Sequence, residues 1–168
     1  QQQQKDVAAQ AASSTPVAAA SGEERRGDAY DSKVQSLYLG LPLSEALVTH
    51  VNGLLRTYAY LEGKIKNVER GDGPRYSVSV RGRGELMVTE SRRIKTPGGT
   101  AQNQINVLSL NTFGVSPFVE YRCSKAADSC YIKNPSNGDD WIKIAYDEAG
   151  ARELATALER LIKALQRG

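Results

Sequence analysis

The chain has 168 residues, which is enough for one ordinary domain and too short for two sizeable ones. Hydrophobic residues make up 40% of the chain and charged residues 24%, so a packed core is expected. The 22 Lys and Arg residues barely exceed the 19 Asp and Glu residues, which argues against a dedicated nucleic-acid-binding domain. The apolar runs are only a few residues long, so the sequence predicts no membrane-spanning segment.

Residues 1–29 are predicted to form a disordered tether. Gln, Ala and Ser dominate this stretch and bury almost nothing, and Pro16 and Gly22 interrupt the alanines. A stretch of this kind commonly separates a folded domain from an anchor or a cleavage site, and a lipid anchor upstream of the chain is one alternative. The single folded domain is expected to begin near Tyr30 and to span residues 30–168.

The first predicted helix runs from Ser44 to about Tyr58. Its apolar residues Leu47, Val51 and Leu54 recur at helical spacing. Ser44 is a favourable N-cap residue, because its hydroxyl can accept a hydrogen bond from the first free backbone N–H groups. We therefore expect the helix to begin at Ser44 and to bury one face.

The middle of the chain changes to the two-residue period of β-strands. Residues 75–81 alternate strictly and place Tyr76, Val78 and Val80 on one face. A glycine-rich turn at residues 82–84 leads to a predicted hairpin partner at residues 85–94. Further strands are predicted at residues 60–68, 104–110, 118–123, 130–133 and 141–146.

Local sequence patterns predict a hairpin between the last two strands and a helix at the C-terminus. Asn137-Gly138 predicts a hairpin between the last two strands, closed by a type I′ turn. A helix is predicted from about Glu148 to Gln166, because leucines recur every three or four residues along it. Asp147 is predicted to cap its start.

The predicted order is one N-terminal helix, about seven short antiparallel strands and a C-terminal amphipathic helix. A run of strands between two helices indicates an α+β fold without βαβ units. In element order, seven meandering strands followed by a terminal helix resemble the pleckstrin-homology-like roll. The resemblance implies that the meander rolls into a barrel, and it carries over no site residue because no motif accompanies it.

The two cysteines, Cys123 and Cys130, are predicted to form a disulfide. Each has strand-like neighbours, and the six residues between them suit a hairpin turn, so the two side chains would face each other across the strands. Closing this loop would stabilise the fold by about 2–2.5 kcal/mol on the chain-entropy model. Disulfides persist in oxidising compartments, so the protein is expected to be periplasmic or secreted. Two buried free thiols in a cytosolic protein are the alternative.

The chain offers few groups for catalysis or metal binding. His50 is the only histidine, it lies inside the first predicted helix, and no serine has the surroundings of a nucleophile. One histidine and two paired cysteines are too few for a zinc site. We therefore expect no enzyme, no cofactor and no metal. The alternatives are carboxylate chemistry at Asp139 and Asp140, and a calcium ion in the polar loop at residues 134–140.

Basic residues concentrate in the first predicted hairpin. Six of them lie between residues 75 and 95, against two acidic residues. The planar guanidinium group of arginine can donate two parallel hydrogen bonds to a phosphate, sulfate or carboxylate group. This surface is therefore a candidate for binding an anionic polymer, lipid headgroups or an acidic protein face. A solvated face that protects the sheet from edge pairing is the alternative. The candidate basic hairpin comprises Arg75, Arg81, Arg83, Arg92, Arg93 and Lys95.

The hairpin around the predicted disulfide is the second candidate surface. A closed loop is preorganised, which lowers the entropy cost of association, and tyrosine and arginine often carry the binding energy of protein interfaces. We expect a non-enzymatic exported protein that binds another envelope or secreted protein, as an inhibitor, an immunity factor or an assembly accessory. An apolar pocket for lipid or cell-wall fragments, and an anionic polymer on the basic hairpin, are the alternatives. The candidate residues of the disulfide hairpin are Tyr121, Arg122, Lys125, Asp128 and Tyr131.

Overall fold

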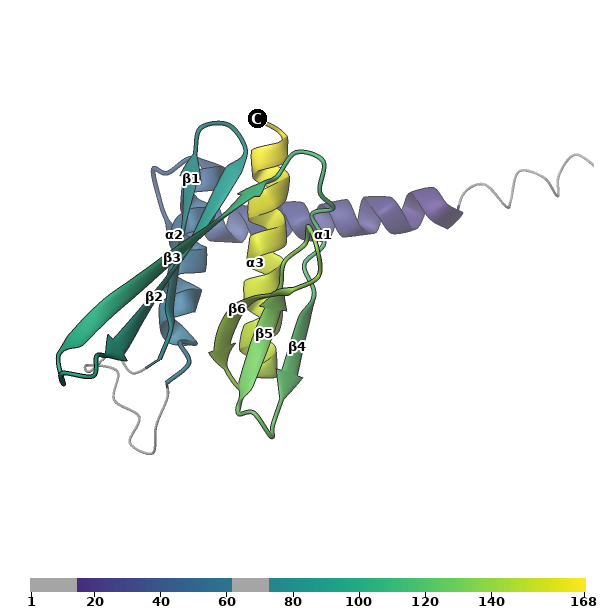
Figure 1. The fold of residues 1–168 in the computed structure, drawn as a ribbon. Coiled ribbons are helices and arrows are strands. Elements are labelled where there is room, and N and C mark those ends of the chain that lie inside the picture. The colour runs from purple at the N-terminus through teal and green to yellow at the C-terminus, as the bar shows by residue number, and fades with distance from the viewer. Residues whose placement is uncertain (1–14, 62–72) are drawn as a thin grey trace, which may run out of the picture.

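A computed structural model describes residues 15–61 and 73–168 of the chain. Within these residues the chain forms three helices and six strands (Figure 1). In chain order they are α1 (Thr15–Leu37), α2 (Leu43–Thr57), β1 (Arg75–Arg81), β2 (Glu85–Lys95), β3 (Ala101–Asn111), β4 (Tyr121–Ser124), β5 (Ser129–Lys133), β6 (Asp140–Ala145) and α3 (Glu148–Gln166).

The strands form two separate antiparallel sheets, in the orders β1-β2-β3 and β4-β5-β6. The predicted α+β class is confirmed, but the described residues contain six strands rather than about seven, and no closed barrel. The segment between β3 and β4, residues 112–120, contains Gly114 and Pro117 and pairs with neither sheet as a strand. It divides the meander into two sheets. The predicted strand at residues 60–68 lies mostly outside the described residues, and its first two residues are not in a strand.

Helix α1 differs from the tether that the sequence predicts. It begins at Thr15, so residues 15–29 are helical, while residues 1–14 lie outside the described residues. Alanine has the highest helix propensity, and Pro16 is tolerated because it stands in the first turn, where its missing N–H costs nothing. The C-terminal half of α1 packs on the domain and buries Val34, which is 1% exposed. In Figure 1 the helix crosses behind α3 and extends beyond the rest of the fold.

A buried ion pair fixes α1 to α3. The Arg160 guanidinium donates from Nε to Asp31 Oδ1 at 2.9 Å and from Nη2 to Asp31 Oδ2 at 2.7 Å. The Arg160 side chain is 7% exposed and that of Asp31 is 9% exposed. Gly27 lies so close that a Cβ there would clash with the guanidinium of Arg160. The glycine therefore leaves the space that the guanidinium occupies.

Helix α2 begins one residue before the predicted start. Pro42 is its N-cap and makes no side-chain cap bond, so the prediction that Ser44 caps the helix is wrong. The fixed φ of proline, −58° here, presets the backbone for helix entry and replaces the capping hydroxyl. The apolar spacing itself is confirmed, because Leu47, Val51 and Leu54 are buried.

The C-terminal helix α3 matches its predicted bounds, and its leucine stripe is buried. Asp147 is the N-cap, as expected: its Oδ1 accepts a hydrogen bond from the backbone N–H of Gly150 at 2.8 Å. Gly150 is buried against the ring of Tyr58, where an added Cβ would stand 2.6 Å from a ring carbon. This contact brings the start of α3 against the end of α2.

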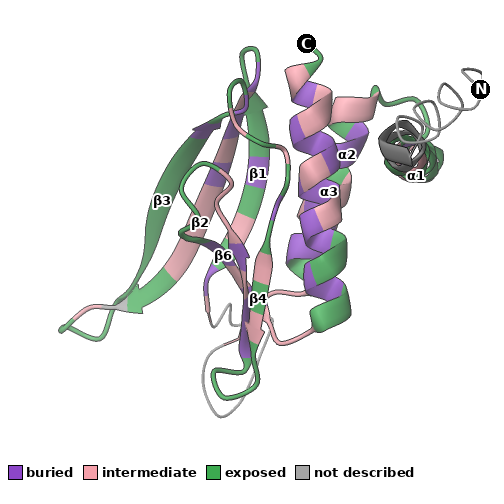
Figure 2. Ribbon diagram, turned by 90° about the vertical axis from the view of Figure 1, so that its right-hand side faces the viewer, coloured by how far each residue is buried: buried purple, intermediate pink, exposed green. Residues whose placement is uncertain are grey.

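The core lies between the helices and the inner faces of the two sheets. The inner face of the first sheet supplies Val78, Leu86 and Val88, and that of the second supplies Ile132 and Ile142. In Figure 2 the buried positions of α3 face the sheets, whereas β3 is exposed along almost its whole length. One sheet edge thus stays outside the core.

The turn between β5 and β6 forms the predicted hairpin with a different geometry. Gly138 has a positive φ of 77°, whereas Asn137 does not. A type I′ turn needs positive φ at both central positions, so this part of the prediction is wrong. The loop instead closes between Asn134 and Asp139, with the Asn134 N–H donating to the Asp139 carbonyl at 2.8 Å.

Candidate protein-binding surfaces

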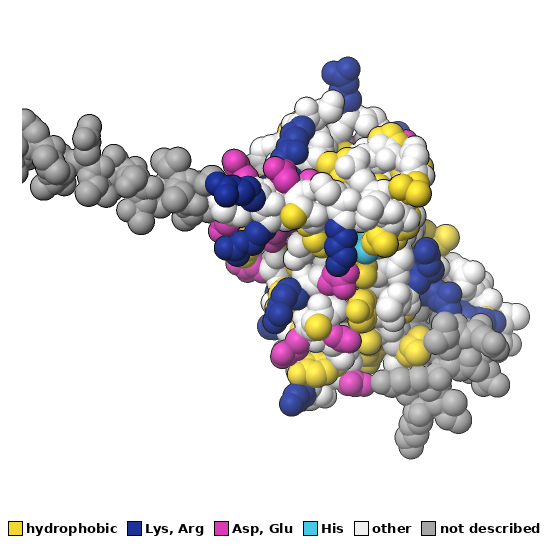
Figure 3. All heavy atoms as spheres, turned by 180° about the vertical axis from the view of Figure 1, so that it is seen from behind, with side chains coloured by type: hydrophobic (Ala, Val, Ile, Leu, Met, Phe, Trp, Pro, Cys, Tyr) yellow, Lys and Arg dark blue, Asp and Glu magenta, His cyan; other side chains and the backbone are white. Residues whose placement is uncertain are grey.

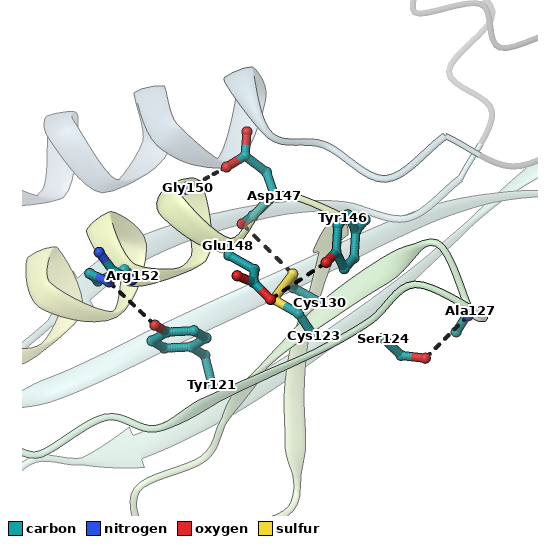
Figure 4. The surroundings of a disulfide bond; sticks show 10 residues. All are labelled: Tyr121, Cys123, Ser124, Ala127, Cys130, Tyr146, Asp147, Glu148, Gly150 and Arg152. Atoms are coloured by element: carbon teal, nitrogen blue, oxygen red, sulfur yellow. Dashed lines mark hydrogen bonds between the residues drawn. A yellow bond between two sulfur atoms is a disulfide. The ribbon is translucent and has the colours of Figure 1, made fainter.

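The predicted disulfide is present between Cys123 and Cys130, which face each other directly in the register of β4 and β5. The bond lies on the inner face of the second sheet, beside the start of α3 (Figure 4). There the Cys130 Sγ atom is 3.7 Å from the carbonyl oxygen of Asp147, the N-cap of α3. The disulfide therefore closes the hairpin where the sheet meets the helix.

The five candidate residues of the disulfide hairpin divide between two faces and the tip. Tyr121 lies on the inner face and accepts a hydrogen bond from Arg152 Nε of α3 at 3.4 Å (Figure 4). Arg122 and Tyr131 are register partners on the outer face. Lys125 and Asp128 lie in the turn, where the Asp128 N–H donates to the Lys125 carbonyl at 3.1 Å. The structure thus joins two of the five on one outer surface.

Two further residues extend this outer surface. Lys143 on β6 is the register partner of Tyr131, and its Nζ lies 3.9 Å from the ring centroid of Tyr60 and 5.9 Å from that of Tyr131. Ammonium groups in this position are attracted by the electrons of the ring face. Together these side chains form the aromatic–basic row, which consists of Arg122, Tyr131, Lys143 and Tyr60.

Sequence reasoning missed Lys143 and Tyr60. The alternation of β6 does place Lys143 on the face opposite to the buried Ile142 and Ile144, so its position on the face of Tyr131 could have been predicted. Tyr60 carries no such signal, because it follows the end of α2. It reaches the second sheet through an isolated bridge between Ala59 and Ile144.

The polar loop after β5 uses the amide oxygens of its two asparagines in internal hydrogen bonds. Asn134 Oδ1 accepts hydrogen bonds from the N–H and the hydroxyl of Ser136, and Asn137 Oδ1 accepts from the N–H of Asp139. Asp140 pairs with Lys133 and lies 3.8 Å from Arg122 Nη2. In residues 15–61 and 73–168 no three His, Cys, Asp or Glu side chains gather as they would around a metal ion.

His50 is packed among aromatic rings on α2. Its Nδ1 is 3.3 Å from the Tyr38 hydroxyl and its Nε2 is 3.6 Å from Glu153 Oε1. The rings of Tyr30 and Tyr38 both meet the imidazole edge to face, and the His50 side chain is only 13% exposed. These contacts give His50 a structural role between α1, α2 and α3.

The candidate basic hairpin does not form one surface. Arg75 and Arg81 stand at opposite ends of β1, about 20 Å apart at the rise of an extended strand. Arg92 points to the inner face, where its Nε is 3.7 Å from Glu90 Oε1. Arg83 lies in the turn before β2, Arg93 lies on the outer face near Arg75, and Lys95 ends β2. On the side of the molecule where α1 lies, which Figure 3 shows, basic side chains occur together with acidic ones.

A cleft of about 340 Å³ lies where the two sheets approach each other. Trp141 of β6 stands at one side, and Tyr76 and Leu108 of the first sheet at the other. The Tyr76 hydroxyl donates to Glu90 Oε2 at 3.0 Å, and burial raises the pKa of Tyr76. The cleft therefore combines apolar walls with one polar edge.

A larger groove of about 650 Å³ separates α1 from α3. It is lined by Tyr30, Phe118 and the buried Arg160, and Phe118 is 63% exposed. Burial raises the pKa of Tyr30 to about 12, and burial also raises the pKa of Glu159, which accepts a hydrogen bond from the Val119 N–H. The groove owes its shape to the ion pair that holds α1 in place.

Strand β3 presents the most exposed sheet edge of the described chain. Ten of its eleven residues are exposed and only Leu110 is buried. The exposed side chains include Ile105 at 63% and Val107 at 51%. The strand contains no charged residue and no proline, which are the usual protections of an edge strand. The lack of charged residues and proline in residues 101–111 is visible in the sequence, so an unprotected edge strand could have been predicted there.

Over residues 15–61 and 73–168, the chain forms an α+β domain in which α2 and α3 lie against two three-stranded antiparallel sheets and α1 packs on these two helices. No protein-family model, no curated protein and no solved structure matches the chain. Among the helices of the described residues, none has the length and the hydrophobicity to cross a membrane.

Proposed function

We propose that this chain is an extracytoplasmic, non-enzymatic protein-binding module whose working surface is the aromatic–basic row. The observation that carries the proposal is the alignment of Arg122, Tyr131, Lys143 and Tyr60 across the outer face of the disulfide-closed sheet. Tyrosine and arginine are enriched among residues that dominate protein interfaces, because they bury a large area and still form hydrogen bonds.

The rigidity of the row supports this proposal. Three of its four residues come from the sheet, one from each strand, and the Cys123–Cys130 bond joins two of these strands covalently. A surface that is ordered before binding loses less conformational entropy on association. The disulfide also fits an oxidising compartment, which is where a periplasmic or secreted inhibitor, immunity factor or assembly accessory would act.

The charge of the row suggests the chemistry of the partner. Lys143 is held over the Tyr60 ring, and the Arg122 side chain is 66% exposed, with its Nη2 atom 3.8 Å from Asp140 Oδ2. Both cations can therefore turn to an incoming carboxylate. A protein face that offers acidic groups between apolar ones would complement the row in charge and in hydrophobicity.

Alanine at Tyr131 or Arg122 is expected to weaken partner binding by about 30-fold, which corresponds to a hot-spot loss of about 2 kcal/mol. The oxidised full chain serves as bait in an envelope or culture-fluid extract, and the retained protein is then titrated against each variant. Arg81→Ala is the matched control, because Arg81 is exposed and lies on the other sheet. Equal binding by the wild type, Tyr131→Ala and Arg122→Ala would exclude the row.

A salt series separates this proposal from an anionic polymer bound through the basic residues. Charge contacts to a polyanion weaken steeply as salt rises, whereas a packed protein interface persists. A ligand released at moderate salt and insensitive to Tyr131→Ala would favour the polymer.

The inter-sheet cleft supports a second candidate function, the binding of a small apolar ligand such as a lipid or a cell-wall fragment. Its volume of about 340 Å³ falls within the range of small-molecule sites. Trp141 is the only tryptophan of the chain and lines the cleft, so its fluorescence reports on occupancy. Titration with a short-chain fatty acid or soluble peptidoglycan fragments should shift the emission in a saturable way if the cleft binds them. An unchanged spectrum throughout both titrations would remove this candidate.

A further inference from the structure

The free edge of β3 carries a defined set of unpaired backbone groups. A backbone hydrogen bond closes the ladder between β2 and β3 at each end, from the Thr96 N–H to the Thr100 carbonyl and from the Thr112 N–H to the Gly84 carbonyl. Antiparallel hydrogen bonding alternates along a strand. The backbone N–H and C=O groups of the even-numbered residues of β3 therefore bond to β2, and those of the odd-numbered residues point away from β2 at the free edge. The outward-pointing residues are Ala101, Asn103, Ile105, Val107, Ser109 and Asn111.

The opposite edge of the same sheet is occupied at its middle. Asn52 of α2 accepts a hydrogen bond from the Val78 N–H at 2.7 Å and donates one to the Val78 carbonyl at 3.0 Å. This side chain takes the place of a neighbouring strand at the middle of β1. A further strand can therefore extend the sheet at β3 and not at β1.

We propose that a second copy of this chain pairs with the β3 edge, so that two β3 strands run antiparallel about a two-fold axis at Asn106. The paired sheet then has six strands, in the order β1-β2-β3 followed by the same three in reverse. In this register Ile105 of one copy lies opposite Val107 of the other. The two-fold symmetry produces this pair twice. Four β-branched side chains thus form one apolar cluster on the outer face.

Three features of the strand favour a second copy over an unrelated segment. The two strands are equal in length, so all eleven positions can pair. They contain no charge, so symmetry places no like charges opposite each other. Because Asn52 closes the β1 edge, the pairing is isologous and ends at a dimer rather than continuing into a fibre. This interface is separate from the aromatic–basic row and does not depend on it.

Val107→Pro tests the interface without disturbing the monomer. The Val107 N–H points outward, so proline there removes an edge donor and leaves the bonds between β2 and β3 in place. We expect the wild-type full chain to sediment as a dimer, and Val107→Pro to weaken dimerisation by at least about tenfold at unchanged far-ultraviolet circular dichroism. Val107→Ile is the matched control and should stay dimeric. A wild type that sediments as a monomer at millimolar concentration, or a Val107→Pro dimer of undiminished affinity, would overturn the proposal.

A cysteine at the two-fold axis tests the register. Asn106 would face its own copy as a non-hydrogen-bonded pair, where Cα atoms are about 4.5 Å apart and side chains are close. Asn106→Cys is therefore expected to form an interchain disulfide under mild oxidation. Ser79→Cys, an exposed position on β1 of the same sheet, is the control and should stay uncrosslinked. Equal cross-linking of the two variants, or none with Asn106→Cys, would rule out this pairing.

Discussion

Replacing Arg160 with alanine is expected to lower the free energy of unfolding by about 3–5 kcal/mol, which is the cost of leaving one partner of a buried ion pair uncompensated. The substitution leaves the Asp31 carboxylate, 9% exposed, without its two hydrogen bonds from the guanidinium. It also removes the contact that holds α1 against α3. Urea unfolding, followed by circular dichroism, measures the change.

Arg152→Ala is the matched control for this prediction. Arg152 lies on the same helix, it is exposed, and its hydrogen bond to Tyr121 is long at 3.4 Å. Exposed charges of this kind contribute little, so its unfolding curve should nearly coincide with that of the wild type. Equal stability of the Arg160→Ala and Arg152→Ala variants would show that the ion pair does not hold α1.

Substitutions at two glycines of α1 test the contact between α1 and Arg160 of α3. An added Cβ at Gly22 meets nothing within 4 Å, so Gly22→Ala should stabilise the protein by up to about 1 kcal/mol through helix propensity. At Gly27 the same substitution pushes against the buried guanidinium of Arg160 and should destabilise the protein instead. A stabilising Gly27→Ala would contradict the position of α1 on α3.

Reducing the Cys123–Cys130 disulfide is expected to lower the free energy of unfolding by about 2–2.5 kcal/mol. The bond closes a loop with a sequence separation of seven residues, and a loop of that size loses this much chain entropy in the unfolded state. Unfolding of the oxidised protein and of the protein in dithiothreitol should therefore give separate midpoints. Coinciding midpoints would contradict the prediction.

A double variant isolates the covalent bond from other effects of the reductant. Cys123→Ala with Cys130→Ala removes both sulfur atoms, so its unfolding midpoint should not respond to dithiothreitol. Alanine is preferred at position 130 because this residue is 0% exposed and a serine hydroxyl there would be buried. Thiol titration of the denatured, unreduced wild type should detect no free thiol.

Much of the fold could be predicted because its signals are local. The alternation of residues 75–81, the leucine stripe of α3 and the cap at Asp147 each involve neighbours within a few residues of one another. The disulfide is also a local feature, because the register of one hairpin is enough to bring its two cysteines together. Within the predicted tether, residues 15–29 are helical in α1, which the local pattern could not decide because an alanine-rich segment is only marginally stable as an isolated helix.

The candidate sites were harder to predict, because strand alternation divides side chains that are neighbours in the sequence. Arg92 and Arg93 are consecutive, yet one points toward Glu90 on the inner face and the other lies on the outer face. The six basic residues therefore do not share one surface, although Arg75 and Arg93 lie near each other. The aromatic–basic row shows the converse, because Tyr60 follows α2 and no local pattern joins it to the three residues on β4, β5 and β6.

The sequence by itself determined the α+β class, most element bounds, the disulfide and the uncharged character of β3, since each depends on composition or on short-range periodicity. Only the tertiary structure decided where α1 lies, because Arg160 and Asp31 are 129 residues apart in the chain. It also decided which sheet edge is closed, since Asn52 reaches Val78 only when α2 packs beside β1. Contacts between segments far apart in the chain leave no periodic trace in the sequence, so packing alone could reveal them.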